Sequence, residues 1–154
     1  MKLLSSTILD KGDRVVAMQN GKWGVVLADL KGTWLISPEF DYIGYPNNIT
    51  HVCKNGLWGV MDIEKGEYLI PPECEQIDDY NGFMFMNGIG SYEKGGLHGV
   101  ITSYGSFTGA IFEDLDLEPD EWVKVKYKGE WGYIDENNQF TTDEDEASYN
   151  LDVD

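Results

Sequence analysis

One short motif recurs four times along the chain and constrains the fold more than any other feature. It reads Gly-x-Trp/His-Gly followed by two apolar residues, with the aromatic position at Trp23, Trp58, His98 and Trp131. Successive motifs are 35, 40 and 33 residues apart. A repeat of this length is one supersecondary unit, which buries its hydrophobic face only by stacking on neighbouring units. The motif therefore predicts a stacked repeat array.

Each motif begins at the turn of an expected β-hairpin. Asn20-Gly21 and Asn55-Gly56 are favoured type I′ turn pairs, in which both residues take positive φ, and Gly95-Gly96 and Lys128-Gly129 are weaker forms. Hairpin strands are expected over 15–19, 22–27, 50–54, 57–62, 122–127 and 130–135. Four residues before each turn glycine the side chain is expected to face the core (Ala17, Val52, Tyr92, Val125). Three residues before it the set is mixed or exposed (Met18, Cys53, Glu93, Lys126).

A third strand is expected after a second turn, because Gly32–Ile43 and Gly66–Ile77 match at the same offsets. The predicted fold is all-β: four antiparallel three-stranded meander repeats of about 35 residues, stacked as a propeller-like or open β-array. We expect a single domain over residues 1–142, followed by an acidic C-terminal tail over 143–154. Residues 2–6 are expected to pair as a strand and cover an edge.

The Trp-Gly pair has an expected structural role. Trp23, Trp58 and Trp131 are predicted to be buried, equivalent anchors, since a Trp side chain buries about 200 Å². The following glycine points to the opposite face and lets another strand approach closely. His98 is interpreted as a departure from the motif in a degenerate repeat.

These residues resemble the WG-repeat (KWG-type) family of bacterial β-rich proteins. Asn20–Trp23 with Ile36 and Pro38 fits the family pattern, as does Asn55–Trp58 with Ile70 and Pro72. The third unit departs at His98, and the fourth ends in acidic residues instead of Ile-Pro-Pro. The resemblance covers roughly residues 14–142 and implies an all-β repeat architecture with a binding role. Chains of this size also resemble immunity proteins of interbacterial toxin systems.

Charge excludes some classes of function. The chain has 28 acidic and 11 basic residues, a net charge of −17, and residues 113–154 alone hold fifteen acids and three lysines. Such a chain repels phosphate, so direct nucleic-acid binding is not expected. Membrane insertion is not expected either, because no apolar run approaches about 18 residues. Met1–Leu4 is too short for a signal peptide, which leaves the cytoplasm as the expected location.

No signature of catalysis, cofactor binding or metal binding is present. Cys53 and Cys74 are expected to be thiols, and with His51 and His98 they lack the spacing of a metal site. The acidic run 113–121 lacks the calcium-loop pattern. The chain is therefore predicted not to be an enzyme and to bind no cofactor. A two-carboxylate hydrolase stays open as an alternative, with pairs such as Glu73–Glu75 and Asp78–Asp79.

The predicted function is that of an acidic inhibitor, most simply an immunity protein that covers the active-site cleft of a basic toxin, a nuclease above all. The partner is expected to be basic because nucleases bind phosphate, and an acidic surface mimics that phosphate. The expected binding residues are Glu113, Asp114, Asp116, Glu118, Asp120, Glu121 and Trp122. The alternative is a structural or regulatory module that binds a peptide or carbohydrate on an aromatic platform (Trp34, Tyr42, Tyr45, Trp122).

Overall fold

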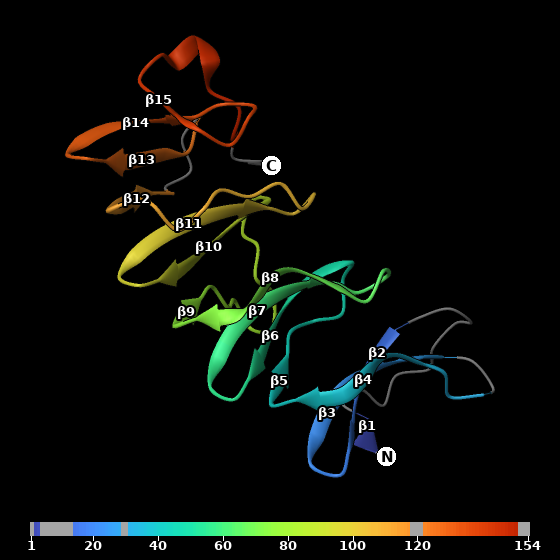
Figure 1. The fold of residues 1–154 in the computed structure, drawn as a ribbon. Coiled ribbons are helices and arrows are strands. Elements are labelled where there is room, and N and C mark those ends of the chain that lie inside the picture. Colours follow the sequence, from blue (N-terminus) through green and yellow to red (C-terminus); the bar gives the residue numbers. More distant parts are fainter. Residues whose placement is uncertain (1, 4–13, 29–30, 118–121, 151–154) are drawn as a thin grey trace. The chain divides into compact units, whose positions relative to one another are not determined.

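The computed structural model describes residues 2–3, 14–28, 31–117 and 122–150, and Figure 1 shows its strands in chain order. The chain divides into two compact units, Met1–Glu73 with Asn81–Phe83 and Cys74–Tyr80 with Met84–Asp154. The elements of the described residues are β-strands and a single 3₁₀ turn, η1 (Glu144–Glu146). The prediction of an all-β chain built from four antiparallel sheets is confirmed.

The first unit contains two four-stranded sheets. The first sheet has the order β1-β2-β3-β4, with bounds Lys2–Leu3, Arg14–Gln19, Lys22–Leu27 and Trp34–Phe40. The second has the order β5-β6-β7-β8, with bounds Tyr42–Ile43, Ile49–Lys54, Leu57–Asp62 and Glu67–Cys74. Lys2 and Leu3 pair with Met18 and Ala17, so the expected edge strand is confirmed at these two residues. Residues 4–6 of that expected strand lie outside the described residues.

The second unit contains the other two sheets. The third sheet has the order β11-β10-β9, where β9 is Gln76–Ile77, β10 is Ile89–Lys94 and β11 is Leu97–Thr102. Single bridges from Phe107 to Ile101 and from Phe112 to His98 continue along β11. The fourth sheet has the order β12-β13-β14-β15, with bounds Asp114–Asp116, Lys124–Tyr127, Glu130–Ile134 and Phe140–Thr141.

The connecting segments contribute strands that the sequence does not predict. β5, β9 and β12 are two or three residues long, and each pairs antiparallel with the first strand of the hairpin that follows it. A segment this short has no readable alternation of polar and apolar residues. In these three sheets the predicted three-stranded meander is therefore extended by one short strand. In the fourth sheet this strand, β12, carries part of the expected site.

The four hairpin turns have the expected backbone. Both turn residues take positive φ at Asn20 and Gly21 (54° and 79°) and at Asn55 and Gly56 (55° and 82°). The weaker pairs, Gly95-Gly96 and Lys128-Gly129, do the same. A type I′ turn matches the right-handed twist of its strands, so these four pairs fix the register of the four hairpins that they connect.

The glycine after each Trp lies at a point of close backbone approach. A Cβ atom built on Gly24, Gly59 or Gly132 would lie 2.4–2.6 Å from the carbonyl oxygen of Ile36, Ile70 or Thr141 on the third strand. At Gly99 the same space is filled by the ring of Tyr92, 2.3 Å from such a Cβ. The expected role of this glycine is confirmed, since no larger residue fits at these positions.

Each unit contains one apolar core, which joins the two sheets of that unit. The first joins residues of the first sheet (Val16, Val25, Ile36, Phe40) to residues of the second (Ile43, Val52, Met61) and to Ile63. The second joins Ile89 and Val100 of the third sheet to the fourth sheet and its neighbours (Val123, Val125, Ile134, Phe112, Tyr149). Each such side chain contributes about 1.5–3 kcal/mol on full burial. All four residues expected to face the core, Ala17, Val52, Tyr92 and Val125, are buried.

The prediction that three Trp side chains are equally buried is wrong for Trp131. Trp23 packs against the first core and Trp58 is half-buried, whereas 48% of Trp131 is exposed. The three are equivalent in register, opposite Met18, Cys53 and Lys126 respectively. Trp131 is exposed because its face of β14 lies opposite the one that enters the second core, and its cross-strand neighbour is charged.

The last described segment packs on the fourth sheet. The backbone N–H of Ser148 donates to the Ile134 carbonyl at 2.8 Å, and that of Val123 donates to the Tyr149 carbonyl at 2.9 Å. Tyr149 is buried in the second core, and η1 stays exposed. Part of the segment expected as an acidic tail is thus folded onto β14, with its carboxylates outward.

Candidate functional site

The expected acidic site is centred on β12. Glu113 precedes this strand, Asp114 and Asp116 belong to it, and all three side chains are exposed. Leu115 between them packs against the second core, so the alternation of a half-buried strand points both aspartates outward. Glu118, Asp120 and Glu121 lie outside the described residues. The structure therefore locates three of the six expected carboxylates.

Glu113 has a structural contact that sets it apart from the two aspartates. The backbone N–H of Gly129, in the turn of the following hairpin, donates to Glu113 Oε1 at 2.7 Å. Asp41 and Glu75 occupy the equivalent place before β5 and β9, and accept from the backbone N–H groups of Asn55 and Gly95 at 2.7 and 3.0 Å. We call this contact the turn clasp. It is a recurring part of the repeat rather than a feature of the fourth sheet alone.

Lys22 and the turn clasp together perturb the pKa of one of these acids, Asp41. The pKa of Asp41 is lowered from its ordinary value, first by the hydrogen bond from Lys22 and then by the backbone N–H of Asn55. Hydrogen bonds and a nearby positive charge both favour the ionised carboxylate. The turn clasp is thus made with the charged form of Asp41.

The outward face of the fourth sheet carries a row of three directly paired side chains. Asp114 lies opposite Lys126, and Lys126 lies opposite Trp131, so all three point to the same face. One step along, Asp116 lies opposite Lys124 on that face. We call Asp114, Asp116, Lys124, Lys126 and Trp131 the outer face of the fourth sheet. It combines an exposed indole with charges of both signs.

Trp122 is the apolar anchor that the sequence suggests. It is half-buried and forms an isolated bridge with Asn150, next to the buried Val123. The structure brings the exposed Trp131, not Trp122, together with Asp114. The sequence contains the signal that identifies Trp131: the residue three places before the turn glycine is Lys126 here, whereas it is Met18 or Cys53 in the first two repeats.

The described residues from 113 to 150 carry a strongly negative net charge. The described part of residues 113–150 contains ten carboxylates and three lysines, a net charge of −7. Two of the lysines lie directly opposite Asp114 and Asp116, so the excess charge comes from the surrounding acids. These are Glu113, Glu130, Asp135, Glu136 and the four residues 143–146. A clustered charge of this size attracts cationic partners over about one Debye length, ~8 Å at physiological ionic strength.

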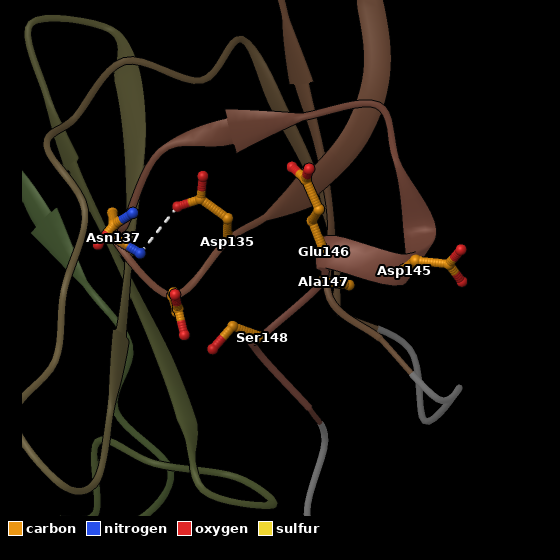
Figure 2. A pocket seen from close by; sticks show the side chains of 7 residues that line it. Asp135, Asn137, Asp145, Glu146, Ala147 and Ser148 are labelled. Carbon is orange, nitrogen blue, oxygen red and sulfur yellow. Dashed lines mark hydrogen bonds between the residues drawn. The ribbon is translucent and has the colours of Figure 1, made fainter.

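An open cavity of about 500 Å³ adjoins the end of β14 (Figure 2). Its lining comes from the turn after β14 and from η1, namely Asp135, Glu136, Asn137, Asp145, Glu146, Ala147 and Ser148. Asp135 Oδ1 accepts the backbone N–H groups of Asn137 and Gln139 at 2.9 and 3.0 Å, and it therefore shapes the turn. Within the described residues, no group of three or more His, Cys, Asp or Glu side chains is arranged to hold a metal ion.

The other candidate residues are dispersed. Trp34 and Tyr42 are half-buried, while Tyr45 is 55% exposed and stacks on Phe83 with ring centroids 4.7 Å apart. Glu75 belongs to a turn clasp. Cys53 and Cys74 are thiols. Among the described residues there is no helix of the length and apolarity that crossing a bilayer requires.

Comparison with known proteins agrees with the repeat seen in the structure. Residues 27–58 and 58–96 each match the family model described as WG containing repeat. No curated protein and no solved structure matches the chain. The same hairpin and glycine geometry continues on both sides of the matched segment, at Gly21–Gly24 and at Gly129–Gly132. Residues 27–96 are thus similar to WG repeats, which supports a WG-repeat family.

Proposed function

We propose that this protein is a non-enzymatic binding module that holds a basic protein on its acidic second unit. In its specific form, the proposal is that the partner is a toxin nuclease and that the chain acts as its immunity protein. A WG-repeat β module is compatible with a protein-binding role. The fold alone does not fix a function, so the proposal rests on the surface of the fourth sheet.

The observation that carries the proposal is the exposed Trp131. The equivalent Trp23 packs against a core and Trp58 is half-buried, yet Trp131 is 48% exposed beside Asp114 and Lys126. Exposed Trp side chains concentrate binding energy when a partner covers them. Trp131 supplies the apolar anchor of the proposed interface, a role that the sequence suggested for Trp122 or nearby aromatic residues.

The negative charge defines the chemistry of the partner. The net charge of −7 in the described part of residues 113–150 favours a surface rich in Lys and Arg. A nuclease carries such a surface because its cleft binds phosphate. Complementary charge accelerates association, up to about 10⁸–10⁹ M⁻¹s⁻¹ at low salt. The carboxylates around β12 then occupy the positions that phosphates take in the cleft, and substrate is excluded without any chemical step.

One observation favours a second candidate function, the binding of a peptide or carbohydrate. Tyr45 and Phe83 of the first unit stack with an interplanar angle of 23° and are 55% and 43% exposed. Exposed aromatic rings serve as platforms for apolar or sugar surfaces. This candidate predicts that binding depends on Tyr45 and is insensitive to the charge of β12.

The test is a binding experiment with a double variant and a matched double-variant control. The immobilised protein is exposed to a lysate of its native host, and proteins released by a salt step are identified and assayed for nuclease activity. Association of the purified partner is then measured with Asp114→Asn/Asp116→Asn. The control is Glu64→Gln/Glu67→Gln, which removes the same charge from exposed sites in the first unit.

The proposal predicts a basic partner whose nuclease activity disappears when this protein is added in stoichiometric amount. Asp114→Asn/Asp116→Asn should slow association about threefold or more, with a weaker salt dependence, and the control should change it much less. Trp131→Ala should instead accelerate dissociation about tenfold or more. An acidic partner, or capture that Tyr45→Ala abolishes and the β12 variants do not affect, would contradict the proposal.

A further inference from the structure

A hollow of about 140 Å³ opens on the third sheet, in the repeat where His98 replaces Trp. Its walls come from β9, β10 and β11 and from Asp78 next to β9. The lining residues are Gln76, Ile77, Asp78, Ser91, Tyr92, Glu93 and His98. Apart from Ile77 and Tyr92, all of the lining side chains are polar. This distinguishes the hollow from an unfilled part of the apolar core.

The hollow occupies the place that aromatic rings fill in the second sheet. Cross-strand pairing makes Gln76, Glu93 and His98 the counterparts of Tyr42, Cys53 and Trp58. Ser91 stands where the second sheet has His51, five residues before the turn glycine. In the second sheet the rings of Tyr42, His51 and Trp58 pack with centroids 5.6–5.8 Å apart. In the third sheet smaller polar side chains replace them, and the space stays open.

The chemistry of the walls suits a cation with several N–H donors. Asp78 is half-buried, and its Oδ2 accepts the backbone N–H and the hydroxyl of Ser91 at 2.8 and 2.9 Å, which fixes the carboxylate. Glu93 is half-buried on the same face of the sheet. The amide of Gln76 and the imidazole of His98 also line the hollow. These groups together offer acceptors from three strands and a flat ring.

We infer that this hollow binds an arginine side chain of the basic partner, an inference that rests on the proposed function. A planar guanidinium presents five donors and pairs with carboxylates in a fixed geometry, and it also stacks on flat rings. A lysine ammonium is a compact point charge without a planar set of donors. It therefore fits a site made of two carboxylates and a flat ring less well. The bound arginine adds a planar group beside His98, in a row where the second sheet packs three aromatic rings.

The inference can be tested with a defined probe, N-acetyl-L-arginine amide, on the full chain. Its binding is followed through the backbone amide resonances of Ser91, Glu93 and His98, with N-acetyl-L-citrulline amide as an uncharged analogue of the same shape. Two variants change the hollow. Glu93→Gln removes one carboxylate, and His98→Trp restores the residue that the other three repeats carry at this position. Glu67→Gln, an exposed carboxylate of the first unit, is the control.

We expect the arginine amide to bind with a dissociation constant of roughly millimolar order, as is usual for a single small cation. The citrulline amide should bind at least tenfold more weakly. Glu93→Gln should weaken binding about threefold or more, and His98→Trp should abolish it while the hairpin stays folded. Equal binding of the citrulline amide, or of N-acetyl-L-lysine amide used as a second comparison, would overturn the inference. Unchanged binding to His98→Trp would also overturn it, as would no shift with 20 mM of the arginine amide (about twenty times that constant).

Failure of this inference is distinguishable from failure of the proposed function. If a basic partner binds the wild type and His98→Trp equally, the hollow is not part of the interface and the proposed function stands. If the hollow binds the arginine amide and no basic protein binds the chain, the proposed function fails instead.

Discussion

The second and fourth sheets are built on the same motif and use its Trp differently. In both, the Trp lies opposite the residue three places before the turn glycine, Cys53 for Trp58 and Lys126 for Trp131. In the second sheet the rings of Tyr42 and His51 lie against Trp58, with centroids 5.6 and 5.8 Å away. In the fourth sheet Asp114 takes the place of Tyr42, and Trp131 is 48% exposed.

This comparison separates two roles within one motif. The glycine sets the backbone geometry, because the third strand approaches Gly59 and Gly132 equally closely. The cross-strand row decides what the indole does, since aromatic neighbours bury it and charged neighbours leave it accessible. Substitutions in this row can therefore change the exposure of the indole while the geometry around the glycine stays the same.

The largest expected effect tests the feature that the two sheets share, which is the close approach of the third strand to the glycine. Gly59→Ala and Gly132→Ala place a methyl group 2.5–2.6 Å from a carbonyl oxygen that belongs to the backbone and cannot rotate away. Each should lower the free energy of unfolding by about 3 kcal/mol, measured by urea denaturation. Gly109→Ala is the matched control, because its Cβ would meet only the Ile111 side chain at 3.6 Å. If Gly132→Ala were as mild as the control, the two sheets would not share this geometry.

The second-largest expected effect tests the feature in which the two sheets differ, which is the environment of the Trp side chain. Trp58→Ala should lower the free energy of unfolding by about 3–4 kcal/mol, because it removes a ring that packs against two others. Trp131→Ala should cost about 1 kcal/mol or less, since about half of its surface already contacts water. Urea denaturation of the two variants under one condition measures the difference. Equal losses would mean that Trp131 is a structural anchor like Trp58.

The smallest expected effect concerns acid stability and the turn clasp. The pKa of Asp41 is lowered from 3.8, so the unfolded chain binds a proton more readily than the folded protein. The stability that Asp41 contributes is present above about pH 4 and is lost as the pH falls through its lowered value. Asp41→Asn should flatten the dependence of the unfolding midpoint on pH below 4. An acid profile unchanged by Asp41→Asn would show that the contacts of Asp41 with Lys22 and with the turn add no stability.

The sequence predicts those parts of the fold that depend on neighbours along the chain. The turns at Asn20-Gly21 and Asn55-Gly56 are local, and they fix strands whose observed bounds, such as Lys22–Leu27 and Leu57–Asp62, equal the predicted ones. The short strand β12 was missed, because three residues have no readable period. The exposure of Trp131 was missed because the repeated motif predicts the same burial in every repeat, although the charged residue opposite Trp131, Lys126, can be read in the sequence. Predicting the hollow beside His98 requires β9 to be placed next to β10, and a strand of two residues has no readable period either.

The most direct test of the central claim is hydrogen exchange of the complex with the basic partner. The account predicts slower exchange on complex formation in two segments of the fourth sheet, residues 113–117 and 129–133, because these carry β12 and Trp131. Residues 44–48 around Tyr45 should exchange as in the free protein. Protection confined to the Tyr45–Phe83 region, with residues 113–117 and 129–133 unchanged, would contradict the claim that the outer face of the fourth sheet binds the partner.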